Sequence, residues 1–329
     1  MMRKSWKIAL AVVLSFGLLA FTALPAAAEK YPSKPIKIIV PLGAGGSHDL
    51  HSRAVASVLH QYIGQPAYVQ LMPGGGGKIG MGALKRAKPD GYTLLMGANS
   101  HLYMSPHVKD MGFDPFKDFI PVFQINELPY LLVTLGNQPW KNFKEYIAAA
   151  KKSKGKIKHG STGTYGLSHT MMLKIAYDTK TKLPHVPFRG GGPAMKAMLG
   201  GHVQTAGANP ATGGVLSNYK SGKIRILGVA AAKRFPLFPD VPTFREQGVD
   251  LLLSSKRIVM VPAGTPKDRI EILEKALLKM AKDKTFKRLL RKMGVKAEPV
   301  VGEKLLKEVR AEYESNKDIY KNAGVKIRN

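Results

Sequence analysis

A strand pattern and a helix pattern are joined by the stretch Pro41-Leu42-Gly43-Ala44-Gly45-Gly46-Ser47-His48-Asp49. It follows an apolar run at residues 36–40, which predicts a buried strand, and it precedes apolar residues that recur at helical spacing. The first N–H groups of a helix have no intrahelical partner, and the helix dipole is positive there, so this helix start is suited to hold an anion. The alternative is a tight strand-to-helix turn with Ser47 as the N-cap.

Alternating strand and helix patterns fill residues 36–322, which predicts an α/β fold. Glycine-rich loops follow several of the strands, at residues 73–77, 97–101, 160–166 and 189–193. Since ligands bind beyond the carboxyl ends of parallel strands, these loops predict a polar cleft. The expected strands are residues 36–40, 67–71, 93–96, 120–125, 131–135, 157–159, 185–187, 203–206, 225–230 and 258–261. The expected helices are residues 48–63, 79–87, 143–152, 167–179, 193–199, 266–281, 285–293 and 303–322.

The N-terminus, residues 1–28, has the pattern of a cleaved signal peptide. Arg3, Lys4 and Lys7 precede an apolar run at residues 8–21, and three alanines at 26–28 supply cleavage-site chemistry. An uncleaved membrane anchor is the alternative, but the apolar run is short for a span. We therefore expect an exported protein.

The 329-residue chain is strongly basic, with 51 Lys and Arg against 22 Asp and Glu and a formal charge of +29. Such a charge favours anionic partners. The basic residues are spread along the chain and the protein is expected to be exported, so we predict a solvated basic surface and no nucleic-acid partner. The absence of cysteine excludes disulfides, thiolate metal sites and thiol nucleophiles.

Several nucleotide-binding and catalytic motifs are absent. The first loop contains Gly43-x-Gly45, but His48 stands where a dinucleotide fingerprint needs its third glycine. The sequence contains no P-loop, no G-x-S-x-G elbow and no H-E-x-x-H motif. His48 and His51 could share a metal ion, but no third ligand is suggested nearby, so we predict no metal and no cofactor.

Motifs along nearly the whole mature chain, in order and with matching spacing, resemble the Bug family, the extracytoplasmic (TctC-like) receptors of tripartite tricarboxylate transporters. They are Tyr31-Pro32-x-Lys34-Pro35-Ile36, Val40-Pro41 with Gly45-Gly46-x-x-Asp49-x-x-x-Arg53, Gly64-Gln65-Pro66, Pro73-Gly74-Gly75-Gly76-Gly77-x-Ile79-Gly80, Pro89-Asp90-Gly91-Tyr92-Thr93-Leu94-Leu95, Gly160-Ser161 with Gly163, Gly166 and His169, Val186-Pro187-Phe188-x-Gly190, Pro239-Asp240-Val241-Pro242-Thr243, and Pro262-Ala263-Gly264-Thr265-Pro266.

The resemblance implies a type II periplasmic binding protein, with two α/β lobes, two crossing segments and a ligand cleft between the lobes. Lobe I would comprise residues 29–126 and 250–329, and lobe II residues 127–249. It further implies a periplasmic receptor without catalysis, a monomer, that captures a small organic carboxylate and delivers it to membrane permease subunits. The ligand-binding residues carried over by motif are Gly45, Gly46, Ser47, Asp49, Asn99, Ser100, His101, Ser161, Thr162, Gly163, Thr164, His169 and Asn209.

The chain departs from the family pattern at three places. In the first loop, residues 42–44 stand where prolines are usual, and Asn209 stands where an acidic residue is common. The third departure is Ser254-Ser255-Lys256-Arg257-Ile258, which replaces a segment with aromatic residues and glycine. If Lys256 or Arg257 faces the cleft, the ligand gains a cationic partner and a di- or tricarboxylate is favoured. The alternative is that both lie at the rim or in solvent, as most Lys and Arg do.

Two other function classes compete with the receptor. An exported hydrolase-like enzyme on the same scaffold could use Ser161 or Ser168 with His169, although no orienting acid is identifiable, and these groups could equally bind a ligand or cap the helix. A basic surface protein could bind anionic polymers without a cleft, which would make its binding steeply salt-dependent.

Overall fold

The computed structural model describes residues 30–328, so the predicted signal peptide lies outside the described residues. Contacts divide the chain into Met1–Ser33 and Lys34–Asn329. In the first unit, residues 30–33 form no helix or strand. All the elements named below belong to the second unit, and no helix among the described residues is long and apolar enough to cross a membrane.

The strands of the second unit form one continuous sheet, in the order β2-β1-β3-β9-β4-β7-β5-β6, with β10 and β8 each paired to β4. Within it, β1 is parallel to β2 and β3, and β5 is parallel to β6 and β7. The strands are β1 (Ile36–Val40), β2 (Ala67–Leu71), β3 (Thr93–Ala98), β4 (Phe119–Leu135), β5 (His159–Ser161), β6 (His185–Pro187), β7 (Thr205–Ala208), β8 (Ile224–Ala230), β9 (Ser254–Pro262) and β10 (Val300–Val301).

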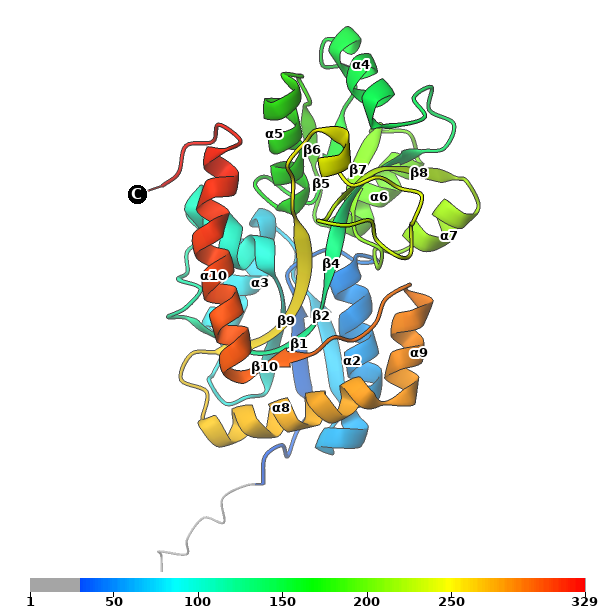
Figure 1. The fold of residues 1–329 in the computed structure, drawn as a ribbon. Helices are drawn as coiled ribbons and strands as arrows, with labels where there is room; N and C mark the ends of the chain where they lie inside the picture. The colour runs from blue at the N-terminus through cyan, green and yellow to red at the C-terminus, as the bar shows by residue number, and fades with distance from the viewer. Residues whose placement is uncertain (1–29, 329) are drawn as a thin grey trace, which may run out of the picture. The chain divides into compact units, whose positions relative to one another are not determined.

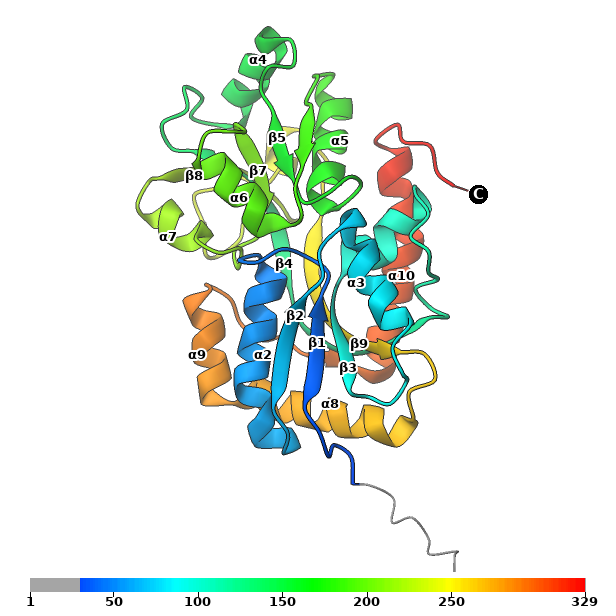
Figure 2. The same cartoon turned by 180° about the vertical axis from the view of Figure 1, so that it is seen from behind.

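Two α/β lobes are joined through β4 and β9 (Figure 1). The first part of β4 pairs with β9 and β10, and its last part pairs with β7 and β8. Helices α2, α3, α8, α9 and α10 surround lobe I, and α4, α5, α6 and α7 surround lobe II (Figures 1 and 2). These helices are α2 (Ser47–Ile63), α3 (Lys78–Lys85), α4 (Phe143–Ser153), α5 (Leu167–Thr179), α6 (Gly191–Leu199), α7 (Val215–Lys220), α8 (Lys267–Lys282), α9 (Lys284–Lys292) and α10 (Gly302–Lys321).

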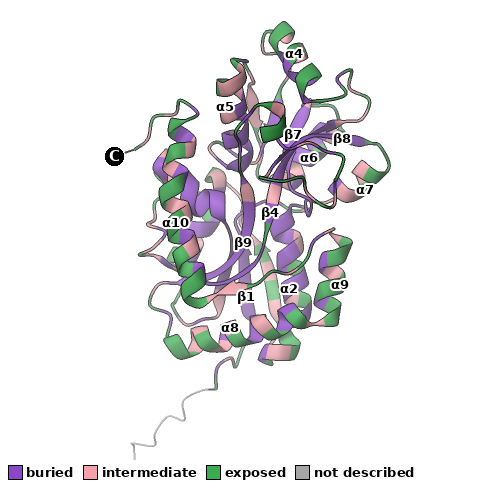
Figure 3. Ribbon diagram, in the orientation of Figure 1, coloured by how far each residue is buried: buried purple, intermediate pink, exposed green. Residues whose placement is uncertain are grey.

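The apolar faces of the helices pack on the sheet, whose central strands are buried and whose edge strands β2 and β6 are partly exposed, while the outer faces of α8, α9 and α10 are exposed (Figure 3). Helix α8 shows why: Leu273, Leu277 and Met280 recur at helical spacing and are all fully buried. The predicted α/β class and two-lobe arrangement agree with this architecture, whereas the residue boundaries given for the lobes stay a prediction.

Three local features differ from the sequence prediction. The strands expected at 120–125 and 131–135 are one strand, because register shifts near Phe123, Glu127 and Val133 let β4 continue past Pro129. The loop after β3 coils into a short π-helix, Ser100–Met104, and a 3₁₀ turn, Ser105–His107. Helix α7 and the two-residue strand β10 were not expected, since both are too short to show a period.

Candidate functional site

The loop between β1 and α2 is held by the side chain of Asp49. The Asp49 carboxylate accepts hydrogen bonds from the Gly45 N–H at 2.8 Å and from Arg53 Nε at 2.8 Å. Gly45 has a φ of +76°, a conformation that favours glycine, and Gly46 is the N-cap of α2. With both oxygens of Asp49 engaged, the buried carboxylate fixes the loop, and the first amides of α2 remain without a partner in the helix.

The α6 start lies against this loop. A Cβ added to Gly192 would come within 2.1 Å of the Ala44 carbonyl oxygen and 2.8 Å of the Gly46 nitrogen. The Gly43 N–H also donates to the Arg189 carbonyl at 2.6 Å. Backbone of lobe II therefore touches backbone of lobe I, and only glycine leaves room at position 192.

Three helix starts surround a small, partly open cavity lined mostly by buried residues, which we call the inner cavity. Gly46 and Ser47 come from α2, Leu167 from α5 and Gly191 from α6. The volume is about 30 Å³, roughly two to three times what one buried water requires. The other lining residues are Leu42, His48, Ala98, Ser100, His101, Tyr130, Thr162, Asn209, Thr212 and Ser255. No carboxylate is among these described residues, so the positive ends of three helices face space that is suited to an anion.

A larger hollow adjoins the inner cavity through the shared residues Leu42 and Thr162, and we call it the outer pocket. It has a volume of about 540 Å³ and lies between the glycine loop at 74–77 and residues 162–164. Lys109 and Arg189 also line it, and the Lys109 ammonium donates to the Thr164 carbonyl at 3.1 Å. The lining, within the part of the chain that is described, has two cations and no carboxylate.

His101 is a buried polar residue that also lines the inner cavity. It is 1% exposed, and neither of its ring nitrogens has a hydrogen-bond partner. Burial, with a smaller contribution from the Lys109 charge, lowers the His101 pKa to about 3, so the ring is neutral at physiological pH. A neutral imidazole offers one donor and one acceptor, which a ligand in the cavity could use.

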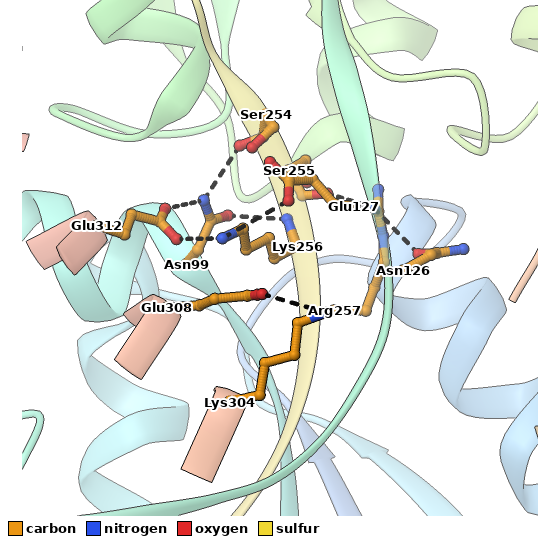
Figure 4. Close-up of polar contacts among 10 residues, drawn as sticks. All are labelled: Asn99, Asn126, Glu127, Ser254, Ser255, Lys256, Arg257, Lys304, Glu308 and Glu312. Carbon is orange, nitrogen blue, oxygen red and sulfur yellow. Dashed lines mark hydrogen bonds and ion pairs between the residues drawn. The ribbon is translucent and has the colours of Figure 1, made fainter. Parts of the chain in front are cut away.

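Lys256 and Arg257 are buried, at 7% and 0% exposure, so the alternative that both lie at the rim or in solvent is wrong. The Lys256 ammonium lies 2.9 Å from the Glu312 carboxylate and 3.6 Å from that of Glu127 (Figure 4). The Arg257 guanidinium instead lies behind the inner cavity, with Nη2 at 3.2 Å from Ser47 Oγ. Ser255, on the same strand, lines the cavity itself.

The residues that the resemblance carried over divide into three groups. Six line the inner cavity: Gly46, Ser47, Ser100, His101, Thr162 and Asn209. Thr162, Gly163 and Thr164 line the outer pocket. The others, Gly45, Asp49, Asn99, Ser161 and His169, line neither hollow. Whether any of these residues binds a ligand stays a prediction.

The residues outside both hollows have structural contacts. The Asn99 amide donates to Glu312 at 2.6 Å and to the Ser254 carbonyl at 3.1 Å, and it accepts from the Lys256 N–H at 3.0 Å (Figure 4). Ser161 Oγ lies 2.8 Å from a ring nitrogen of His185. His169 Nδ1 accepts from the Tyr165 N–H at 3.0 Å, and its ring stacks on that of His185 at 3.6 Å. The Asn99 contacts join the end of β3 to β9 and α10, whereas the contacts of Ser161 and His169 position the loop between β5 and α5, whose Thr162 lines the cavity.

The arrangement does not resemble a hydrolase triad. Ser168 Oγ contacts His159 Nε2 at 2.7 Å, and the other ring nitrogen of His159 contacts Thr205 at 3.0 Å instead of a carboxylate. No group of three or more His, Cys, Asp or Glu among residues 30–328 could hold a metal ion. Nδ1 of His51 contacts the Ser47 carbonyl at 2.7 Å, and His48 Nε2 contacts the Lys256 carbonyl at 3.2 Å, so both rings are already engaged.

Sequence reasoning missed several residues of the inner cavity. Tyr130 and Thr212 had no local signal, because their positions depend on how β4 and the loop after β7 pack. Gly191 belongs to a glycine loop that was noted, and its place at the start of α6 could have been inferred from the α2 loop by analogy.

Comparison with known proteins gives a consistent picture. A family model described as the tripartite tricarboxylate transporter family receptor matches residues 51–325. A UPF0065 protein from the gbd 5′ region of Cupriavidus necator is 33% identical over 269 residues, covering 82% of this chain and 81% of the relative. Protein BugT of Bordetella pertussis is 33% identical over 271 residues, covering 81% of this chain and 82% of the relative.

Solved structures share the fold. The periplasmic binding protein BugD matches with a TM-score of 0.84 and 28% identity, over 90% of this chain and 99% of that one. MatC from Rhodopseudomonas palustris with bound malate matches with a TM-score of 0.80 and 25% identity, over 88% and 99%. The R. palustris protein Rpa4515 with adipate matches with a TM-score of 0.82 and 26% identity, over 90% and 99%.

Proposed function

The chain belongs to the tripartite tricarboxylate transporter receptor family, and from this premise we propose that it captures a small organic acid, with one carboxylate group in the inner cavity, and delivers it to a transporter of that type. The resemblance seen in the sequence is thereby confirmed. The proteins it matches are solute-binding proteins, so the chain is a receptor and not an enzyme, and the hydrolase alternative is set aside.

The observation that carries the proposal is the convergence of three helix starts, from α2, α5 and α6, on a cavity lined by hydroxyls and amides but by no described carboxylate. Main-chain amides and hydroxyls can solvate a carboxylate without a lining Lys or Arg. Two relatives of the same fold were solved with malate and with adipate, both carboxylic acids, which supports the same ligand class for this chain.

We further propose a location, a membrane partner and an oligomeric state for the receptor. Family membership implies a periplasmic location. The signal peptide, the permease subunits as partners and the monomeric state rest on the sequence pattern and on the family. Closure of two lobes on a ligand shifts an open–closed equilibrium, and the closed form is the one that a permease could recognise.

A thermal-shift panel of C4 to C8 organic acids on ligand-free protein tests the function. Ligand at 100 times its Kd stabilises the fold by about 2.7 kcal/mol. For roughly 300 folded residues this raises Tm by about 4 °C. A shift with one or more acids, absent with the matching diamides or alcohols, is the expected result. No shift with any acid, together with salt-sensitive binding to a polyanion such as heparin, would favour the basic surface protein instead.

A further inference from the structure

The hydrogen-bond capacity of the Ser47 hydroxyl is already partly used. Its oxygen lies 3.0 Å from Asn209 Nδ2 and 3.2 Å from Arg257 Nη2. Arginine can only donate. The Asn209 amide is oriented by its Oδ1, which accepts the Ala211 N–H at 3.1 Å, so its Nδ2 also donates to Ser47. Both lone pairs of the Ser47 oxygen are therefore filled, and its own hydrogen remains to be donated.

The hydrogen of the Ser47 hydroxyl can be donated only into the inner cavity. Ser47 is 4% exposed and lines the inner cavity, and within residues 30–328 no acceptor receives a bond from its hydroxyl. With two donors behind it, the hydroxyl points its hydrogen toward the cavity, beside the free amides at the start of α2. The Ser47 hydroxyl and the α2 amides beside it thus present donors to the cavity.

Arg257 adds a buried charge that has no directly bonded carboxylate, although the Glu127 charge acts on it from a longer distance. Its side chain is fully buried, and Nη1 donates to the Ser255 carbonyl and, at 3.4 Å, to the Asn126 amide oxygen. Across the described chain no carboxylate bonds to it, and its Nε has no partner. Lys256, one residue earlier, is the contrast, because its charge is matched by Glu312 and Glu127 (Figure 4). Burial lowers the Arg257 pKa to about 9, so the guanidinium is still charged at neutral pH.

We propose that Arg257 is the specificity-determining positioning residue of this receptor: together with Asn209 it fixes the Ser47 hydroxyl as a donor into the inner cavity and places a positive charge behind it. The site then accepts an ionised carboxylate and rejects its neutral carboxamide, although the two have the same shape. A carboxylate has two acceptor oxygens for the Ser47 hydroxyl and the α2 amides, whereas a carboxamide turns an NH₂ donor against one of them. This inference rests on the proposed function and adds the basis of its selectivity.

The test is calorimetric titration of the mature, ligand-free protein with malate, adipate and succinate, each against its diamide. Wild type should bind at least one acid and prefer it over its diamide by 100-fold or more. Arg257→Met should weaken that acid by about 30-fold, equivalent to about 2 kcal/mol, and the diamide by less than threefold. Ser47→Ala should have the same effect, and the double variant should lose little more than either single variant because the two residues act as one unit.

Lys256→Met is the matched control. This variant removes an equal positive charge one residue before Arg257, and the carboxylates that pair with Lys256 do not line the cavity. It should therefore lower Tm but change the affinity for the acid by less than threefold. If Arg257→Met does not fold, Ser47→Ala and Arg257→Lys carry the test, and Arg257→Lys should keep most of the selectivity.

Three results would overturn the proposal. One is an Arg257→Met or Ser47→Ala protein that binds the acid within threefold of wild type or keeps the full preference over the diamide. Another is equal loss in Lys256→Met, which would make the effect one of total charge. The third is a wild-type protein that binds none of the three acids. This result contradicts the receptor function itself, and it is distinguished from the other two because it appears in the wild type before any variant is measured.

Discussion

Replacing Gly192 by alanine tests whether the contact between the α6 start and the α2 loop belongs to the ligand-bound form. The added Cβ would lie 2.1 Å from the Ala44 carbonyl oxygen and 2.8 Å from the Gly46 nitrogen, both of them backbone atoms that cannot rotate away. Gly192 has no positive φ, so alanine itself is not strained there. Overpacking of this kind costs about 1–3 kcal/mol.

The cost should fall on lobe closure and spare folding. If the lobes part in the ligand-free protein, the clash is absent from that open form. The clash then exists only in the closed, ligand-bound form, so its full cost reduces the free energy of binding. The affinity for malate or another acid that binds wild type should then fall by about 5- to 150-fold, while Tm without ligand changes little. Titration calorimetry gives the affinity, and small-angle scattering with and without ligand reports whether closure is impaired.

Gly82→Ala is the control, because its Cβ would meet only the flexible end of Arg86 on the surface of α3. It should leave affinity unchanged and, as a helical Gly-to-Ala change, should not destabilise the fold. Gly192→Ala protein with wild-type affinity, or with a Tm loss that matches its whole affinity loss, would refute the reasoning that closure is what the alanine opposes.

Three further predictions follow from buried or cavity-lining groups. Acid should destabilise the fold, because burial lowers the pKa of three fully buried histidines, His51, His101 and His159, to about 3 while those of the unfolded chain titrate near 6.5. The unfolded state then binds more protons, so stability that is present above pH 6.5 is lost as pH falls toward 3, by about 2 kcal/mol per histidine at pH 5. Urea titrations from pH 7 to pH 4.5 check this, and a flat profile would contradict it. Lys109→Met should weaken adipate by about 3- to 10-fold at low salt but leave hexanoate unchanged in calorimetry, since the cation lines the outer pocket, and the difference should shrink at high salt; equal effects on both acids would argue against a second anionic group there. Tyr320→Phe should cost about 1 kcal/mol in urea unfolding, because the fully buried hydroxyl donates to the Tyr165 carbonyl at 2.9 Å; an unchanged midpoint would mean that this bond adds nothing.

The α2 loop was predictable because its signals are local. An apolar run, glycines and a helical period lie within 30 residues, and the structure has β1 and α2 within one residue of the expected bounds. The same holds for α8, whose apolar stripe is continuous. The function class was predictable from motif order along the chain, which the family model and the relatives confirm.

The electrostatics of the site could not be predicted in the same way. Residue type alone favours exposure for Arg257, yet pairing of β9 between β3 and β4 buries it completely. Its contact with Ser47 joins residues 210 positions apart, which no local pattern encodes. Likewise, the family resemblance made Asn99 a candidate ligand residue, and no local pattern indicated that α10 returns from the far end of the chain to bond it through Glu312.

A crystal structure of the ligand-free protein soaked with malate would show directly whether the helix starts bind a carboxylate. We expect one malate carboxylate in the inner cavity, within hydrogen-bond distance of Ser47 and of at least one residue of lobe II such as Thr162. Malate ordered only in the outer pocket or on the surface, with the three helix starts facing water, would contradict it.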